Sequence, residues 1–194
     1  MELTMSKLWI ISDTHFWHWN IGRLCNRCAH WQSSIIHEWN KRISPDDHVL
    51  HLGDFAYGRQ STLNRVKLTR TMLNGHIHLF RGNHDGKVAS RKQWLNIIKV
   101  DNYIEKHLEY LELGQYIIVY LLREEHNGDF KKKDPNFYNK KIIYVSHRPI
   151  MGQVRMPYYY GHVHNNHDDK GCLGKNVCVE MNKYTPVFLD TIKP

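Results

Sequence analysis

Apolar residues gather in short runs along this chain, and polar residues mark the end of each run. Residues 7–12 (Lys-Leu-Trp-Ile-Ile-Ser) and 141–146 (Lys-Ile-Ile-Tyr-Val-Ser) are almost continuously hydrophobic, and residues 48–52 and 77–80 form similar runs. Runs of this length are typical of strands that are buried on both faces of a parallel sheet. The pattern therefore predicts four buried strands.

Segments with helical periodicity lie between these strands. We predict a loop and a short helix within residues 16–31, and then a helix capped by Ser33 or Ser34. A second helix ends near Gly75, which suits a helix stop, and a third spans residues 90–98. The predicted inward-facing residues of these three helices are Ile36, Trp39 and Ile43; Leu63, Val66, Met72 and Leu73; and Trp94, Leu95 and Ile98.

Strands dominate the second half of the chain. Residues 108–113 and 116–122 predict a hairpin, and the further predicted strands are residues 158–160, 177–181 and 187–189. A helix-rich first half and a strand-rich second half predict an α/β fold in which two sheets pack together with helices outside. The length of 194 residues predicts a single domain over residues 1–194.

The net charge of +8 at pH 7 favours anionic partners, such as nucleotides, nucleic acid or phosphorylated metabolites. Lysines cluster at residues 131–133 and 140–141, where a solvated loop explains the charge better than a nucleic-acid contact. No apolar run is long enough to span a bilayer, and residues 1–7 have no signal-peptide core. We therefore expect a cytoplasmic protein with no membrane association, and the pattern carries no signal for an oligomeric state.

The cysteines offer an alternative metal site. Cys25 and Cys28, together with Cys172 and Cys178, could bind a structural zinc ion through four thiolates. The second pair has a loose spacing and Cys178 lies in a predicted strand, so reduced thiols without a metal are favoured. A disulfide is disfavoured in a chain without a signal peptide.

Metal-ligand residue types directly follow five of the predicted strands. Because strand ends in an α/β sheet meet at one edge, these residues are expected to lie together. They provide carboxylate, amide and imidazole ligands, enough to bind two divalent cations, and suit manganese, iron, zinc or cobalt better than calcium or magnesium alone. The candidate ligands are Asp13, His15, Asp54, Asn83, His147, His162 and His164.

Two divalent cations close together would activate water for attack on a phosphate ester. Asp54 could bridge them with its two oxygens. Asp13, Asp54 and a bridging hydroxide would leave about one positive charge, which attracts a phosphate anion. His84 follows the candidate ligand Asn83 and could protonate the leaving oxygen or stabilise the transition state. Asp85 is the candidate to orient His84.

Basic and aromatic residues near these positions are candidate substrate contacts. Arg59, Arg148 and Arg155 could hold phosphate oxygens, and His18 is the one other histidine close to the candidate ligands. Nearby rings could stack on a base, although core packing explains the tryptophans equally well and the tyrosines better. These rings are Phe16, Trp17, Trp19, Tyr57 and Tyr158 to Tyr160.

The ligand blocks read D-x-H, G-D, G-N-H-D, H and G-H-x-H from Asp13 to His164. In this combination the chain resembles the calcineurin-like metallophosphoesterase superfamily, in particular its compact stand-alone bacterial and phage-type members. The resemblance implies a four-layer α/β/β/α sandwich, His84 as the catalytic imidazole and two metal ions, usually manganese, with iron, zinc, nickel or cobalt as alternatives. It implies one ion bound by Asp13, His15, Asp54 and His164, and another bound by Asp54, Asn83, His147 and His162.

Two differences between this chain and other members of the superfamily bear on the substrate. Superfamily members that act on phosphoproteins carry G-D-x-V-D-R-G, whereas residues 53–59 read G-D-F-A-Y-G-R and lack the second aspartate. This argues against a protein serine/threonine phosphatase. A chain of 194 residues also leaves no room for the capping domain of the double-strand-break nucleases.

The leading hypothesis is a metal-dependent phosphoesterase that hydrolyses a phosphodiester of a nucleotide or of a nucleic-acid end. The alternatives are a phosphomonoesterase acting on a small phosphorylated metabolite, a non-catalytic binding protein on the same fold, and a nucleic-acid-binding module with an incidental metal ion. The filled ligand positions and His84 argue against the non-catalytic protein.

Overall fold

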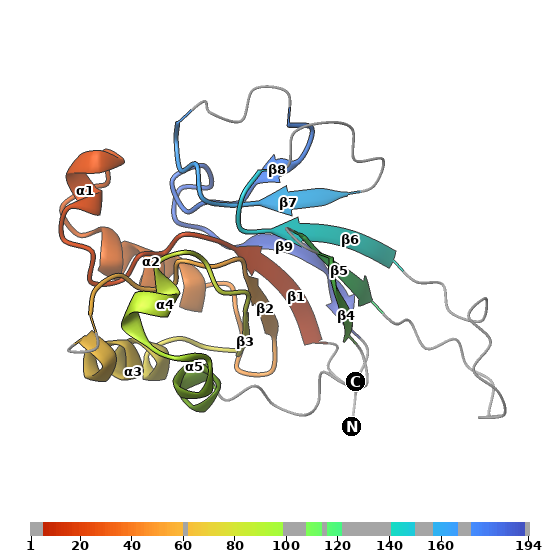
Figure 1. Ribbon diagram of the computed structural model, residues 1–194, viewed down its shortest axis with the longest axis horizontal. Helices are drawn as coiled ribbons and strands as arrows, with labels where there is room; N and C mark the ends of the chain where they lie inside the picture. Colours follow the sequence, from red (N-terminus) through yellow and green to blue (C-terminus); the bar gives the residue numbers. More distant parts are fainter. Residues whose placement is uncertain are drawn as a thin grey trace, which may run out of the picture.

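The computed structural model describes residues 6–59, 62–98, 108–113, 116–121, 141–149, 157–166 and 172–192. These residues form a sheet of order β3-β2-β1-β9 and a sheet of order β4-β5-β6-β7-β8 (Figure 1). The first sheet comprises β1 (Ser6–Ile11), β2 (His48–His51), β3 (His76–Leu79) and β9 (Val187–Ile192). The second comprises β4 (Leu108–Leu113), β5 (Tyr116–Leu121), β6 (Lys141–Ser146), β7 (Tyr158–Tyr160) and β8 (Lys175–Asn176).

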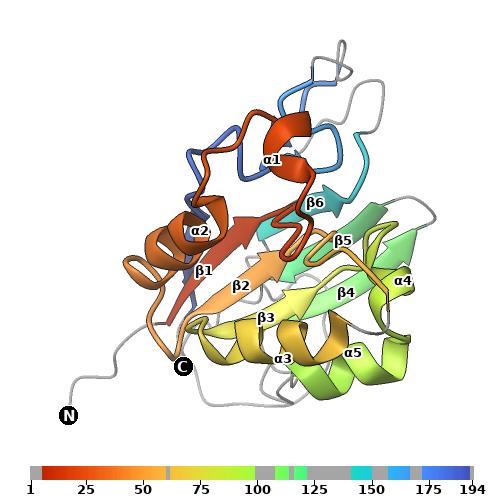
Figure 2. The ribbon, with the colours of Figure 1, turned by 90° about the vertical axis from the view of Figure 1, so that its left-hand side faces the viewer.

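In the described part of the chain, the helices precede β4: α1 (Ile21–Leu24), α2 (Trp31–Asn40), α3 (Leu63–Thr71), α4 (Asp85–Val88) and α5 (Arg91–Ile98). Helices α2, α3 and α5 lie along the face of the first sheet that points away from the second sheet (Figures 1 and 2). The predicted α/β fold is therefore confirmed. The outer helical layer that the resemblance implies on the second sheet stays a prediction. None of the described helices is both long and apolar enough to cross a membrane.

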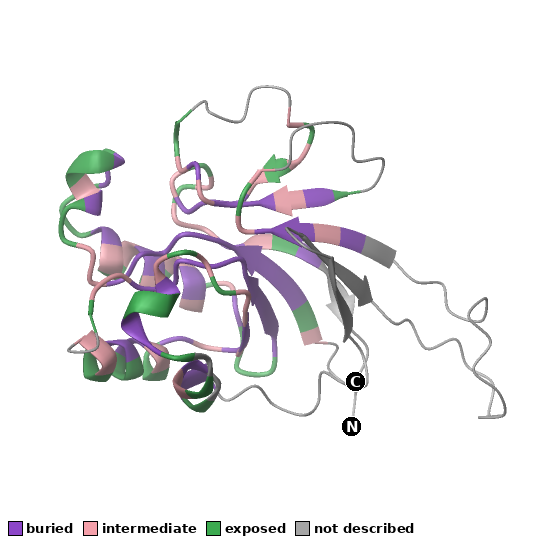
Figure 3. Ribbon diagram, in the orientation of Figure 1, coloured by how far each residue is buried: buried purple, intermediate pink, exposed green. Residues whose placement is uncertain are grey.

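Strand β1 shows why the first sheet needs continuous apolar runs (Figure 3). Leu8 and Ile10 are fully buried in a core that they share with Ile143 of β6. Trp9 and Ile11 point the other way, into the core beneath the helices. Because side chains alternate along a strand, a strand covered on both faces requires apolar residues at successive positions.

Parallel pairing brings the strand ends to one edge of the molecule. β1 pairs in parallel with β2, and β2 with β3, so the chain leaves these three strands at the same edge. β6 and β7 are also parallel, and the hydrogen bond between His147 and the Leu52 carbonyl places the end of β6 beside the end of β2. The antiparallel pairing of β4 with β5 confirms the predicted hairpin.

The prediction for the first long helix requires correction. α2 begins at Trp31 rather than at Ser33 or Ser34. The fully buried row is Ile35, Trp39 and Ile43, spaced four residues apart, and Ile36 is only half-buried.

The other helix predictions hold in part. The prediction that Met72 faces inward is wrong, because this side chain is 40% exposed at the end of α3. Val66, Leu73, Trp94 and Ile98 are buried as predicted. The side chain of Leu95, residue 122 of the hairpin and the lysines of residues 131–133 and 140 lie outside the described part of the structure. Helix α4 was not predicted.

Residues 177–181 do not form the predicted strand. The amide of Val177 donates to the Tyr160 carbonyl over 2.8 Å, and its carbonyl accepts from the Ser12 amide over 3.0 Å. Residues 177–179 are all fully buried, so this apolar run crosses from one sheet to the other. It joins the two sheets at the edge where the candidate ligands lie.

Candidate metal centre

The backbones of most candidate ligands adopt the left-handed conformation. The φ angle is +58° at Asp13, +51° at His15, +53° at Asp54, +74° at His162 and +51° at His164. Residues other than glycine rarely adopt positive φ angles, and those that do are concentrated at functional sites. A backbone hydrogen bond of 2.9 Å from the His15 amide to the Asp54 carbonyl joins two of these loops.

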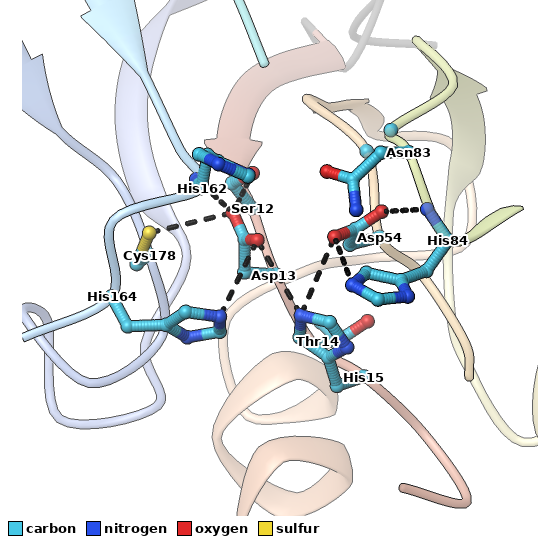
Figure 4. Close-up of polar contacts among 12 residues, drawn as sticks. Ser12, Asp13, Thr14, His15, Asp54, Asn83, His84, His162, His164 and Cys178 are labelled. Carbon is cyan, nitrogen blue, oxygen red and sulfur yellow. Dashed lines mark hydrogen bonds and ion pairs between the residues drawn. The ribbon is translucent and has the colours of Figure 1, made fainter. Parts of the chain in front are cut away.

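Asp13, His15 and His164 form the first cluster, in which one ligand atom of each lies within 4.8 Å of the others (Figure 4). Asp13 Oδ1 is 3.6 Å from His15 Nε2 and 3.8 Å from His164 Nε2. Asp13 Oδ2 instead accepts hydrogen bonds from Ser12 Oγ (2.5 Å) and from the His162 amide (2.7 Å). Asp13 therefore presents Oδ1 as its free ligand atom.

Asp54, His147 and His162 form the second cluster, again with ligand atoms within 4.8 Å. His147 Nδ1 donates to the Leu52 carbonyl over 3.0 Å, so the neutral ring carries its lone pair on Nε2. This nitrogen lies 2.9 Å from Asn83 Oδ1, 3.2 Å from His162 Nδ1 and 3.4 Å from Asp54 Oδ2. Candidate ligand atoms from four side chains thus converge on one point.

Asp54 is a member of the second cluster and also lies next to the first cluster. Its Oδ1 accepts the His84 amide over 2.8 Å. Its Oδ2 is 3.5 Å from His15 Nε2 and 3.4 Å from His147 Nε2. The expectation that both oxygens bridge requires correction, because Oδ2 alone faces the two clusters.

Buried lone pairs without hydrogen bonds mark where cations fit. Asp13 Oδ1 and His15 Nε2 are buried and have no hydrogen-bond partner, which is unusual in a folded protein. The pKa of Asp13 is well below its ordinary value. Burial alone would raise this pKa, but the nearby imidazole of His15 and the charge of His147 outweigh burial. An ionised carboxylate surrounded by imidazoles suits a divalent transition-metal ion.

The His84 ring lies at the edge of the second cluster. Its Nε2 is 3.8 Å from Asp54 Oδ2, and its ring centroid is 4.9 Å from that of Tyr57. His18 stacks on the same tyrosine at 3.7 Å and lies 5.3 Å from the His15 ring. Burial lowers the pKa of His18 to about 4, with the charges of His15 and His84 adding to the effect. The structure therefore places His18 beside the clusters as a neutral ring.

Asp85 has a different role from the predicted one. Instead of contacting the His84 ring, its buried carboxylate accepts the backbone amides of Asp54 (2.8 Å), Phe55 (3.0 Å) and Gly82 (2.8 Å). Burial raises the pKa of Asp85 to about 7, and the charge of Asp54 adds to this while the backbone hydrogen bonds oppose it. Asp85 shapes the loop that carries Asp54.

The two candidate arginines in the described part of the chain lie outside the clusters. Arg148 is exposed, and its charge helps to lower the pKa of His162, after the larger effects of burial and of His147. This coupling places Arg148 near the second cluster. Arg59 is exposed, two residues after Tyr57. Arg155 lies outside the described residues.

Three of the seven candidate stacking rings pack in the core. Phe16, Tyr158 and Tyr160 are 1%, 4% and 3% exposed, so their interpretation as base contacts is wrong. Trp17 is half-buried, with Nε1 donating to a threonine of α3. Trp19 is 69% exposed and remains available for stacking.

Two residues that the sequence reasoning missed support the first cluster. Glu180 Oε1 lies 2.9 Å from His164 Nδ1, and Arg27 Nε donates to the same oxygen over 2.7 Å. Burial opposes ionisation of Glu180, but its hydrogen bond with His164 and the charge of Arg27 lower its pKa. Neither residue stands at the end of a predicted strand, so the spacing of the ligand blocks contained no signal for them.

The alternative zinc site is not supported. All four cysteines are free, with Cys25 and Cys178 buried and Cys28 exposed. Among the described residues, the clusters able to bind a metal ion contain no pair of cysteines.

Two adjacent clusters of carboxylates and imidazoles at the strand ends of this fold define a metal-dependent phosphoester hydrolase. The chain belongs to the calcineurin-like phosphoesterase family, whose model matches residues 6–170. An uncharacterized protein of Methanocaldococcus jannaschii is 38% identical, with 98% of this chain and 91% of the relative covered. The crystal structure of a protein of unknown function from Aquifex aeolicus has a TM-score of 0.60 at 24% identity, covering 94% of this chain and 95% of that chain. This last likeness concerns the fold alone.

Proposed function

We propose that this protein hydrolyses a phosphodiester at a centre of two divalent cations. The first cluster would hold one cation, the second cluster with Asn83 would hold the other, and Asp54 would be a ligand shared by the two sites. The observation that carries the proposal is the convergence of these side chains on two adjacent points. Manganese suits this mixture of nitrogen and oxygen ligands, and iron, zinc, nickel or cobalt could replace it.

When bound, two close divalent cations polarise a phosphate ester and lower the pKa of water toward neutrality. The protein supplies the remaining functions. Asp54 would set the distance between the two cations, and Asp85 holds the loop that carries Asp54. His84, whose Nε2 lies 3.8 Å from Asp54 Oδ2, would donate a hydrogen to the leaving oxygen. Tyr57 packs against the His84 ring.

The proposed substrate is a nucleotide or a nucleic-acid end. The net charge of +8 favours an anion. The exposed Trp19 directly follows His18, which lies beside the clusters, and an exposed indole can stack on a base. The exposed Arg148 lies near the second cluster, where a guanidinium can hold phosphate oxygens.

Turnover of bis-p-nitrophenyl phosphate with Mn²⁺ tests the hydrolysis. We expect His84→Ala to lower kcat by about 10²–10⁴-fold, and Asp54→Asn to abolish turnover. The matched control is His37→Ala, because the His37 side chain is 72% exposed on α2; this variant should keep wild-type turnover. Wild-type protein without metal-dependent turnover would contradict the proposal and support the non-catalytic alternative.

A second assay tests the substrate class. The p-nitrophenyl ester of thymidine 5′-phosphate should have a higher kcat/KM than bis-p-nitrophenyl phosphate, and Trp19→Ala should remove that preference. Leu24→Ala is the control, because Leu24 is similarly exposed (64%) on α1. Faster hydrolysis of p-nitrophenyl phosphate than of either diester would instead support the phosphomonoesterase.

A further inference from the structure

A buried chain of hydrogen bonds ends on one candidate ligand of the first cluster. His164 Nδ1 lies 2.9 Å from Glu180 Oε1. An ionised carboxylate can only accept, so His164 Nδ1 carries the hydrogen and the neutral ring presents the lone pair of Nε2. That nitrogen faces Asp13 Oδ1 at 3.8 Å. Glu180 therefore selects the ring tautomer that can bind a cation.

Arg27 holds this glutamate in place. Its Nε and Nη2 lie 2.7 Å and 2.5 Å from Glu180 Oε1, and its side chain is fully buried. The same guanidinium donates from Nη1 to the Thr14 carbonyl over 2.8 Å and from Nη2 to the Asp13 carbonyl over 2.7 Å. One side chain thus joins the strained loop that carries Asp13 to the glutamate that orients His164.

The two clusters are supported differently. In the second cluster, the Nδ1 atom of His147 donates to a backbone carbonyl, that of Leu52. In the first cluster, the corresponding support of His164 is the Glu180 carboxylate. A buried ion pair contributes little net stability, since desolvation offsets the attraction of the charges. The Arg27–Glu180 pair is therefore better explained by orientation than by stability.

Glu180 lies outside the part of the chain that the family model matches. That match covers residues 6–170, whereas Glu180 directly follows the buried crossing of residues 177–179 that connects the two sheets. Glu180, which follows all of the candidate ligands in the sequence, therefore supports the first cluster.

We propose that Arg27 and Glu180 are positioning residues that set the metal affinity of the first cluster and leave that of the second unchanged. The inference rests on the proposed two-cation centre. Removing the charge of Glu180 should weaken one of two bound ions, because loss of a hydrogen-bonded carboxylate behind a metal-binding histidine typically lowers affinity by about 10–100-fold.

Calorimetric titration of metal-free protein with Mn²⁺ tests this. Wild-type protein should bind two equivalents. Glu180→Gln, which keeps the shape of the side chain, should bind one equivalent with wild-type affinity and the other about 10–100-fold more weakly. The matched control is Glu38→Gln, because Glu38 pairs with Arg42 on the surface of α2, and it should bind both equivalents as wild type does. The visible absorption of bound Co²⁺ should change in Glu180→Gln for one equivalent only.

The outcomes separate the two proposals. If Glu180→Gln binds both equivalents of Mn²⁺ with wild-type affinity, or loses affinity equally for both, the positioning role is overturned while the proposed function stands. A wild-type protein that binds no metal ion would overturn the proposed function itself.

Arg27→Lys provides the second variant, because one ammonium cannot bond the carboxylate and both carbonyls together. If thermal unfolding shows that neither variant folds, the pair is structural and the inference is wrong.

Discussion

His147 Nε2 lies 2.9 Å from Asn83 Oδ1, and each atom presents a lone pair to the other. The tautomer of His147 follows from the Leu52 carbonyl, which can only accept a hydrogen from Nδ1. Asp54 Oδ2 brings a third lone pair to within 3.4 Å of the same nitrogen. With a neutral His147 ring, the fold therefore holds three acceptor atoms close together, an arrangement that a cation among them would stabilise.

Metal binding should consequently stabilise the folded protein. Each cation that binds only the folded chain adds about 2.7 kcal/mol at 100 times its dissociation constant, which for a chain of this length raises Tm by about 5–10 °C. Thermal unfolding of EDTA-treated protein with added Mn²⁺ measures the shift. Ca²⁺ should give a smaller shift, because it prefers oxygen ligands. Equal shifts with both ions would contradict the assignment of these imidazoles as ligands.

Asp85→Asn should destabilise the protein. An amide offers one acceptor oxygen in place of two, so at least one of the buried amides of Asp54, Phe55 and Gly82 loses its partner. A buried donor without a partner costs about 1–3 kcal/mol. Urea denaturation of metal-free protein measures the loss, and Asp46→Asn at an exposed turn serves as the control. A variant as stable as wild type would show that these hydrogen bonds are dispensable.

The strands and the candidate ligands could be predicted from the sequence because both depend on local patterns. An apolar run such as residues 7–12 indicates a strand buried on both faces, and parallel strands end at a common edge. Asp13 and Asp54 could therefore be brought together without knowledge of any side-chain contact. The remaining ligands follow by the same rule.

Roles that depend on side-chain direction could not be predicted in this way. Asp85 follows His84 in the chain, yet its carboxylate turns toward three backbone amides. The hydrogen bond between Arg27 and Glu180 joins residues 153 positions apart, and no periodicity connects them. The hydrophobic run at residues 177–179 was read as a strand, because a buried crossing between two sheets requires the same apolar residues as a strand.

Two glycines should prove necessary for the two carboxylate positions. A Cβ at Gly82 would overlap Asp54 Oδ1, and one at Gly161 would overlap Asp13 Oδ2. Gly82→Ala and Gly161→Ala should each displace a ligand and weaken Mn²⁺ binding. Gly22→Ala is the control, because the nearest atoms to its Cβ would lie 3.7 Å away, on Trp31. Calorimetric titration with Mn²⁺ compares the three variants, and unchanged affinity in both site variants would count against the carboxylate geometry.

A histidine away from the metal centre should make the stability of the protein depend on pH. His78 is 5% exposed, and its Nε2 lies 3.1 Å from His48 Nδ1. Burial lowers the pKa of His78 well below 6.5, with the charges of His48 and His76 adding to the effect. His78 is therefore neutral in the folded chain, whereas in the unfolded chain it binds a proton below about pH 6.5.

Because the unfolded state gains this proton, the contribution of His78 is present above pH 6.5 and is lost as the pH falls toward the lowered pKa of the folded state. As the pH falls below 6, metal-free wild-type protein should lose more unfolding free energy per pH unit than His78→Gln, and one proton sets the upper limit of this difference at about 1.4 kcal/mol per pH unit. Urea denaturation at several pH values measures both slopes. Parallel slopes would show that His78 is already protonated in the folded protein, because then neither state gains a proton in this range.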